Sequence, residues 1–215
     1  MSRGHFITLE GGEGAGKTTA MDAIVEALNR QGRSVHRTRE PGGTPAAERI
    51  RGLLLDPATG ELDPLTELLL MFGARRENVV GSILPALEAG QDVVCDRFTE
   101  ASHAYQGGGR GLGPSPVEAL SSLVHPDLEP DLVLIFDVPV EVGLERIRRK
   151  GDDPDRFEGD RKEFLERVRQ TYLERAEAHP DRFVVIDATR TPDLVRAEAV
   201  EAVTNLVRVS GDRPS

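Results

Sequence analysis

The chain is poor in cysteine and in aromatic side chains: it has one cysteine, no tryptophan, and an aromatic content of 4% over 215 residues. The single cysteine, Cys95, excludes an internal disulfide framework, and its setting in Val93-Val94-Cys95 is typical of a small buried side chain. No apolar run approaches the roughly 20 residues that cross a bilayer, and the first nine residues are too polar for a signal peptide. We therefore expect a cytoplasmic protein that does not enter membranes.

Positive charge is also in short supply. The 27 Lys and Arg residues are outnumbered by 37 Asp and Glu residues, for a formal net charge of −10. This surplus argues against nucleic acid or an anionic membrane as the main ligand. It leaves room for a small anion, because a local cluster of arginines can outweigh a distant acidic surface.

Short β-branched runs alternate with longer helical patterns along the chain. We predict strands at 5–10, 34–39, 92–95, 132–136 and 183–186. We predict helices at 17–30, 44–55, 65–88 with a break near Pro85, 117–124, 140–150, 162–178 and 194–207. Apolar strands separated by helices indicate a parallel sheet covered on both faces, and therefore an α/β three-layer sandwich.

The length and the 38% apolar content fit a single domain, which we place at residues 1–209. The polar residues 210–215 read as a frayed tail. Two segments interrupt the alternation: residues 107–116 (GGGRGLGPSP), which read as a flexible glycine-rich loop, and the charged connector 151–160.

A phosphate-binding loop (P-loop) follows the first predicted strand. Residues 11–18 (GGEGAGKT) match G-x-x-x-x-G-K-[ST] in full, and a predicted helix follows at once. Glycines let consecutive N–H groups converge on a phosphate, and the helix adds its positive N-terminus. Lys17 supplies a charge to the β and γ oxygens, and the Thr18 hydroxyl is a ligand for Mg²⁺. The predicted ATP-binding residues are Gly11, Gly12, Glu13, Gly14, Ala15, Gly16, Lys17, Thr18 and Thr19.

Asp96 and Arg97 form a second polar pair at the carboxyl end of the predicted buried strand 92–95. Ligands bind at these strand ends in doubly wound sheets. Asp96 could hold Mg²⁺ directly or through water, and Arg97 could clamp a phosphate with two N–H groups. The alternative is a structural ion pair. The five histidines are dispersed without metal-ligand spacing, so the only metal we expect is Mg²⁺ brought with the nucleotide.

With these motifs, the chain resembles bacterial-type thymidylate kinases of the P-loop nucleoside-monophosphate kinase group over nearly its whole length. The resemblance rests on residues 6–19 (FITLEGGEGAGKTT), 39–44 (REPGGT), 72–76 (FGARR), 96–111 (DRFTEASHAYQGGGRG), 137–143 (DVPVEVG) and 155–158 (DRFE). It implies a five-stranded parallel sheet flanked by helices, transfer of the γ-phosphoryl of MgATP to dTMP, and a homodimer.

The resemblance also implies roles for residues around the dTMP base. Phe72 would stack on thymine, and Arg76, one helical turn later, would donate to a base carbonyl. Ser102 and Gln106 correspond to positions that contact the base edge. Without the resemblance, Phe72 reads as a core residue and Arg76 as a solvated helix charge. The family commonly has serine where this chain has Ala101.

Around the sugar and phosphate, the implied contacts come from four further residues. Tyr105 would crowd the position of a 2′-hydroxyl, and Glu13 would face the 3′-hydroxyl. Arg97 and Arg51 would clamp the dTMP phosphate, although Arg51 alone reads as a solvated helix charge.

A lid at about residues 149–160 would close on the phosphates. The variable P-loop positions carry no arginine, so the cation that reaches the transferring phosphoryl should come from this lid. Arg156 is the first candidate and Arg149 the second. Composition alone would make the segment an ordinary solvated connector.

Two rival functions remain open at this point. One is a kinase for another small acceptor, such as a different nucleotide or a metabolite. The other is a GTP-dependent switch, against which stands the absence of an N-K-x-D guanine-reading motif from the chain.

Overall fold

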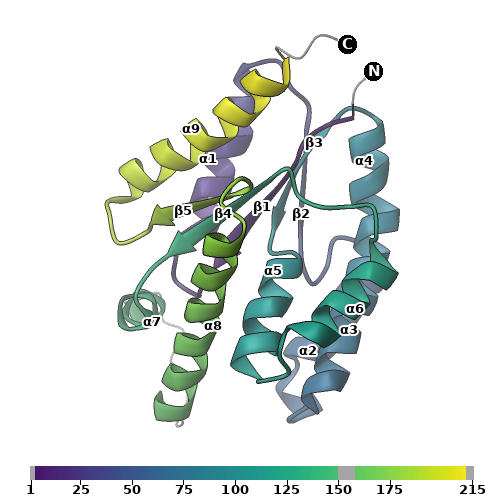
Figure 1. The fold of residues 1–215 in the computed structure, drawn as a ribbon, viewed down its shortest axis with the longest axis vertical. Helices are drawn as coiled ribbons and strands as arrows, with labels where there is room; N and C mark the ends of the chain where they lie inside the picture. Colours follow the sequence, from purple (N-terminus) through teal and green to yellow (C-terminus); the bar gives the residue numbers. More distant parts are fainter. Residues whose placement is uncertain (1–2, 150–157, 212–215) are drawn as a thin grey trace.

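Five parallel strands form one sheet at the centre of the molecule (Figure 1). The computed structural model describes residues 3–149 and 158–211. The strands run in the order β2-β3-β1-β4-β5. Their bounds are β1 (Phe6–Gly11), β2 (Val35–Arg39), β3 (Asp92–Asp96), β4 (Leu132–Asp137) and β5 (Phe183–Asp187). The predicted fold class is confirmed, because all five expected strands are present and all neighbouring pairs are parallel.

Helices cover both faces of this sheet (Figure 1). The helical elements are α1 (Lys17–Arg30), α2 (Pro45–Leu55), η1 (Pro57–Thr59), α3 (Pro64–Asn78), η2 (Val79–Ile83), α4 (Leu84–Glu88), α5 (Thr99–Ser102), η3 (His103–Gly109), α6 (Pro114–Val124), α7 (Val140–Arg149), α8 (Glu158–Ala178) and α9 (Pro192–Gly211). Of the described helices, none is long and apolar enough to span a bilayer.

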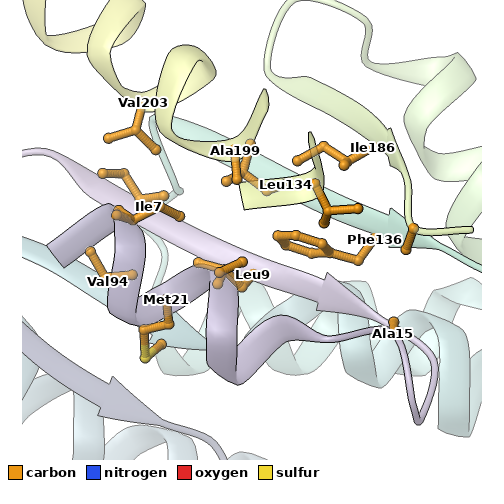
Figure 2. Close-up of a cluster of buried hydrophobic side chains, with 14 of the residues drawn as sticks. Ile7, Leu9, Ala15, Met21, Val94, Leu134, Phe136, Ile186, Ala199 and Val203 are labelled. Atoms are coloured by element: carbon orange, nitrogen blue, oxygen red, sulfur yellow. The ribbon is translucent and has the colours of Figure 1, made fainter. Parts of the chain in front are cut away.

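Alternate residues of the central strand β1 serve opposite layers. Ile7 and Leu9 face α1 and α9 in the largest buried cluster, where Val203 also packs (Figure 2). Phe6 belongs to a different cluster on the other face. Successive strand side chains point to opposite faces, so both faces of β1 are buried and polar β1 side chains have no route to bulk water.

The predicted long helix 65–88 is divided into three parts by Pro85. α3 ends at Asn78, η2 forms a π-helical turn, and α4 continues from Leu84. Proline has no N–H, and its ring collides with the carbonyl four residues earlier. The wider turn of η2 accommodates that missing hydrogen bond directly before the proline.

The prediction of a flexible loop at residues 107–116 was wrong. Gly107 and Gly109 are buried in the π-helical turn η3, and residues 114–116 begin α6. A Cβ atom at Gly108 would lie 2.0 Å from the Thr171 hydroxyl oxygen, and one at Gly109 would lie 2.5 Å from the Phe164 ring. Gly108 and Gly109 therefore allow α8 to pack directly on η3. The glycine-rich pattern, which predicted flexibility, reflects this close packing instead.

Candidate active site

The P-loop lies between β1 and α1 and is shaped by glycines. Gly14 has φ +71°, and a Cβ atom there would lie 2.3 Å from the carbonyl oxygen of Gly143. Gly16, with φ +87°, precedes the first turn of α1. Only glycine adopts these angles and this approach at little cost. The loop therefore presents its backbone next to the exposed side chains of Thr18 and Thr19.

Lys17 folds back onto this loop. Its Nζ donates to the carbonyl oxygens of Gly11 at 3.1 Å and Gly12 at 3.0 Å, and the side chain is 8% exposed. Burial, and next the nearby charge of Arg97, lowers the pKa of Lys17 to about 7. An anionic phosphate at the loop would favour the charged form of this lysine.

A cleft of about 440 Å³ adjoins the P-loop. Of the residues expected to bind substrate, it is lined by Glu13, Arg51, Arg97, Tyr105 and Gln106. Glu13 belongs to the P-loop, so the cleft opens directly beside the phosphate-binding backbone. Its volume lies in the range of a small-molecule site. These residues come from the P-loop, α2, η3 and the turn after β3 and meet only in the folded chain.

Arg97 lies in the turn after β3 with φ +69°, the only non-glycine residue with positive φ among those described. Its Nη2 donates to the Tyr105 hydroxyl at 3.0 Å, and its Nη1 donates to the Tyr172 hydroxyl at 3.3 Å. The guanidinium carbon lies 4.7 Å from the centroid of the Tyr105 ring. Burial alone would lower the pKa of Arg97, but the two tyrosines and Asp96 raise it above its usual range, so the group stays charged.

Glu10, which the sequence analysis did not single out, lies at the end of β1 and is fully buried. Its carboxylate accepts from the Phe98 N–H at 2.7 Å and from the Tyr172 hydroxyl at 3.0 Å. Burial raises the pKa of Glu10 to about 7, against the opposing effect of Arg97.

The expected base-reading pair does not reach the cleft. Phe72 is 1% exposed and packs against Leu68 and Val117 in a buried cluster. Arg76 is exposed, and its Nη1 donates to the Val124 carbonyl at 2.7 Å. Both side chains therefore face α6, and the two roles that the resemblance implied for them are corrected here.

The residues of α3 that face the cleft each lie one position before the pair expected from the sequence. Glu67 and Met71 line the cleft four residues apart, and the next position on that face is Arg75. One residue along a helix rotates a side chain by about 100°. That rotation separates Met71 and Arg75 from Phe72 and Arg76, and sequence spacing alone fits either pair.

Arg75 is 1% exposed and is held on three sides. Its Nε donates to Glu40 Oε2 at 2.6 Å, and its Nη2 donates to the Phe98 carbonyl and to Ser102 Oγ. Its Nη1 has no hydrogen-bond partner among the described residues. Ser102 is fully buried and lies behind this guanidinium, so it supports Arg75 instead of lining the cleft.

Three further polar residues from the predicted site have the following partners. Gln106 Nε2 donates to Glu67 Oε1 at 2.7 Å, while its buried Oε1 has no partner among the residues with described positions. Arg51 Nη1 donates to the carbonyl oxygen of Pro41 at 2.8 Å, after a cis Glu40–Pro41 peptide. Asp96 Oδ1 is buried without a partner in the described chain.

The predicted lid, at about residues 149–160, lies mostly outside the described residues. Arg156 lies outside them. Arg149 is exposed and pairs with Glu145 at 2.9 Å. Two arginines that the sequence analysis did not choose reach the P-loop instead: Arg161 donates to Glu13 at 2.8 Å, and Arg146 donates to the Gly14 carbonyl at 3.3 Å.

Comparisons with known proteins identify the family of this chain. The thymidylate kinase family model matches residues 9–199. The chain is 52% identical over 205 residues to a thymidylate kinase of Chromohalobacter salexigens, covering 95% of this chain and 97% of that protein. It is 52% identical over 207 residues to a thymidylate kinase of Alkalilimnicola ehrlichii, covering 96% and 95%. It is 52% identical over 199 residues to one of Methylobacillus flagellatus, covering 93% and 96%. With its P-loop and adjoining cleft, this chain belongs to the thymidylate kinase family.

Proposed function

We propose that this chain transfers the γ-phosphoryl of ATP to dTMP and releases ADP and dTDP. The observation that carries this proposal is the acceptor cleft beside the P-loop, with Arg51 and Arg97 on its wall. Family membership supports the same reaction. Arginines with fixed donors suit the phosphate of dTMP, while the P-loop backbone suits the phosphates of ATP.

For the base, we propose Met71, Arg75 and Gln106 in place of the pair first expected. Met71 offers an apolar surface to a pyrimidine ring, because it lines the cleft. The unpartnered Nη1 of Arg75 can donate to a base carbonyl, and the unpartnered Oε1 of Gln106 can accept from a base N–H. Thymine has both a carbonyl acceptor and an N–H donor. The two unpartnered atoms therefore favour thymine over a base that presents a donor to Arg75 and an acceptor to Gln106.

For the sugar, Tyr105 keeps its proposed role. It is half-buried and lines the cleft, with its hydroxyl held by Arg97. A ring fixed in this way can exclude a 2′-hydroxyl by bulk. Glu13 lines the same cleft and remains our proposal for the 3′-hydroxyl.

Mg²⁺ fits the residues at the join of the two ligand sites. Asp96 has a buried carboxylate oxygen without a described partner, and Thr18 exposes its hydroxyl at the start of α1. Carboxylate and hydroxyl oxygens are suitable ligands for this hard cation. We propose that Thr18 and Asp96 hold Mg²⁺ directly or through water; when bound, it would neutralise charge on the ATP phosphates.

The protein's own task is then positioning and charge neutralisation. The dTMP phosphate is ionised at neutral pH, so it attacks without a strong general base. Lys17 and Arg97 allow two anions to approach one another, and closure over the cleft excludes water from the γ-phosphoryl. Arg156 remains our first candidate for the cation at the transferring phosphoryl, with Arg149 second.

We also propose a homodimer. Large apolar side chains are exposed on α3, on the adjoining η2 and on the neighbouring α6, namely Leu65, Leu69, Val80 and Leu123. The α3 and α6 helices contact one another, so these side chains belong to one region of the molecule. A patch of this kind marks an interface in many soluble proteins.

A coupled assay of ADP release tests the function. We expect turnover that depends on dTMP and a kcat/KM for dTMP above those for dUMP, dCMP, AMP and shikimate. A higher kcat/KM for another acceptor would assign the chain to a different kinase. Guanine-nucleotide binding without acceptor-dependent turnover would favour the switch instead.

A further inference from the structure

Arg97 is part of a closed ring of hydrogen bonds and backbone that begins and ends at the carboxylate of Glu10. The ring runs from Glu10 to the Phe98 N–H, through the Arg97 backbone to its guanidinium, to the Tyr172 hydroxyl, and back to Glu10. β1 and α8 thereby hold a residue of the turn after β3 from two directions. Neither Glu10 nor Tyr172 lines the acceptor cleft.

The first arm of this ring fixes the backbone of Arg97. A φ of +69° is uncommon for a non-glycine residue and persists only where its surroundings enforce it. The Arg97 N–H donates to the Leu9 carbonyl at 2.9 Å, and the following N–H, of Phe98, donates to Glu10 Oε1 at 2.7 Å. The two bonds secure the turn to the end of β1 on either side of this strained residue.

The second arm fixes the guanidinium. Tyr172 is 2% exposed; its hydroxyl accepts from Arg97 Nη1 and donates to Glu10 Oε2. Because the only hydroxyl hydrogen of Tyr172 goes to Glu10, its lone pairs are directed at Arg97. Glu10 thus determines which way the tyrosine presents its oxygen.

We infer that Glu10 and Tyr172 are positioning residues that hold Arg97 in the geometry needed to bind the acceptor phosphate. The inference rests on the proposed function, in which Arg97 contacts dTMP. A carboxylate and a hydroxyl are costly to bury between the sheet and α8, and an apolar pair would pack there without that cost. Tyr172 accepts from Arg97 directly, and Glu10 acts through the Tyr172 hydroxyl and the Phe98 N–H next to Arg97, which apolar side chains could not do.

The first test is Tyr172→Phe, which removes one hydroxyl and keeps the ring. We expect the KM for dTMP to rise about tenfold, as for the loss of a hydrogen bond to a charged group, with the KM for ATP within twofold. Gln170→Ala, on the exposed side of the same helix, is the matched control and should leave both constants unchanged. A lower melting temperature with unchanged kinetic constants would show a merely structural role and overturn the inference.

A double-mutant cycle shows whether Tyr172 acts through Arg97. In an Arg97→Lys background, which keeps a charge but loses the planar fork, Tyr172→Phe should have less than a threefold effect on kcat/KM for dTMP. An undiminished tenfold effect would mean that Tyr172 acts by another route.

Glu10→Gln gives a second cycle that does not depend on an Arg97 variant. If Glu10 and Tyr172 act on the same arginine, the Glu10→Gln/Tyr172→Phe double variant should be no worse than the worse single variant. Multiplying losses would contradict a shared route. Failure of the proposed function would give a different result, since the unmodified protein would then show no dTMP-dependent turnover.

Discussion

The proposed acceptor and donor sides of this active site differ in the groups that they present to their ligands. On the acceptor side, Arg75 and Arg97 are held by partners from other elements, including Glu40 and Tyr172. On the donor side, a glycine-rich backbone carries the site, and Thr18 and Thr19 are exposed. Side chains fixed in advance select one acceptor, whereas backbone amides serve the phosphates of any nucleotide.

The largest effect should come from the donor side. Lys17→Ala should lower kcat about 10³-fold, the upper range for removal of one preorganised donor. The fold should survive, because the Lys17 ammonium bonds only to loop carbonyls among the described residues. Steady-state turnover measures the loss of kcat, and circular dichroism measures whether the fold survives. Turnover within about threefold of the unmodified protein would remove the P-loop from the mechanism.

The next effect separates two adjacent arginines on the acceptor side. Arg75→Lys should weaken dTMP binding roughly 10- to 100-fold through loss of a charged hydrogen bond, with ATP affinity nearly unchanged. Lysine is preferred to alanine, because leaving Glu40 alone in a buried pair would cost about 3–5 kcal/mol. Arg76→Ala is the control and should have almost no effect on dTMP affinity by calorimetry. The reverse ranking would restore the pair first expected.

The proposed lid at about residues 149–160 supplies a third comparison. Arg156→Ala should lower kcat at least about tenfold, or ~1.4 kcal/mol, with a smaller change in ATP affinity. Arg156→Lys should restore only part of this, because an ammonium lacks the planar two-point contact. Pre-steady-state kinetics separates transfer from product release. Near-normal kcat in both variants, and in an Arg149/Arg156 double variant, would make the lid a passive connector.

The smallest effect concerns stability. Glu10 has a pKa raised by burial from 4.5 to about 7. Between these values Glu10 keeps a proton in the folded protein that it releases in the unfolded chain, so its contribution to the free energy of unfolding falls as pH rises. From pH 5.5 to 6.5 this contribution should be about 1 kcal/mol. Burial lowers the pKa values of His103 and His125 to about 4, and these groups change the stability with the opposite sign over the same range. The contribution of Glu10 is therefore the difference in slope between the unmodified protein and Glu10→Gln, measured by urea unfolding at both pH values. Equal slopes in the two proteins would assign the proton elsewhere.

The fold was more predictable than the acceptor site. The P-loop combines a local strand, a glycine turn and a helix start, and α1 has the predicted bounds, Lys17–Arg30. The chemistry of the P-loop depends on residues that are adjacent in the chain, so the sequence motif alone predicts it. Cys95 is buried, as its apolar setting predicted. The pattern at Gly108 and Gly109 was misinterpreted because glycine is needed there for close contact with α8, more than fifty residues away in the chain.

The proposed base-reading face of α3 shows why the rest of the site could not be predicted. Phe72 with Arg76 and Met71 with Arg75 have the same spacing, and only the rotation of the helix against α6 distinguishes them. Glu10 and Tyr172 lie 162 positions apart, and no local pattern connects them.

The sequence by itself determined the strand and helix pattern, the parallel sheet and the phosphate loop, because these follow from local periodicity and motif chemistry. Only the tertiary structure decided which arginine of α3 is buried and which partners hold Arg97. Those choices depend on packing between distant elements, where a rotation of one residue exchanges a buried charged group for an exposed one.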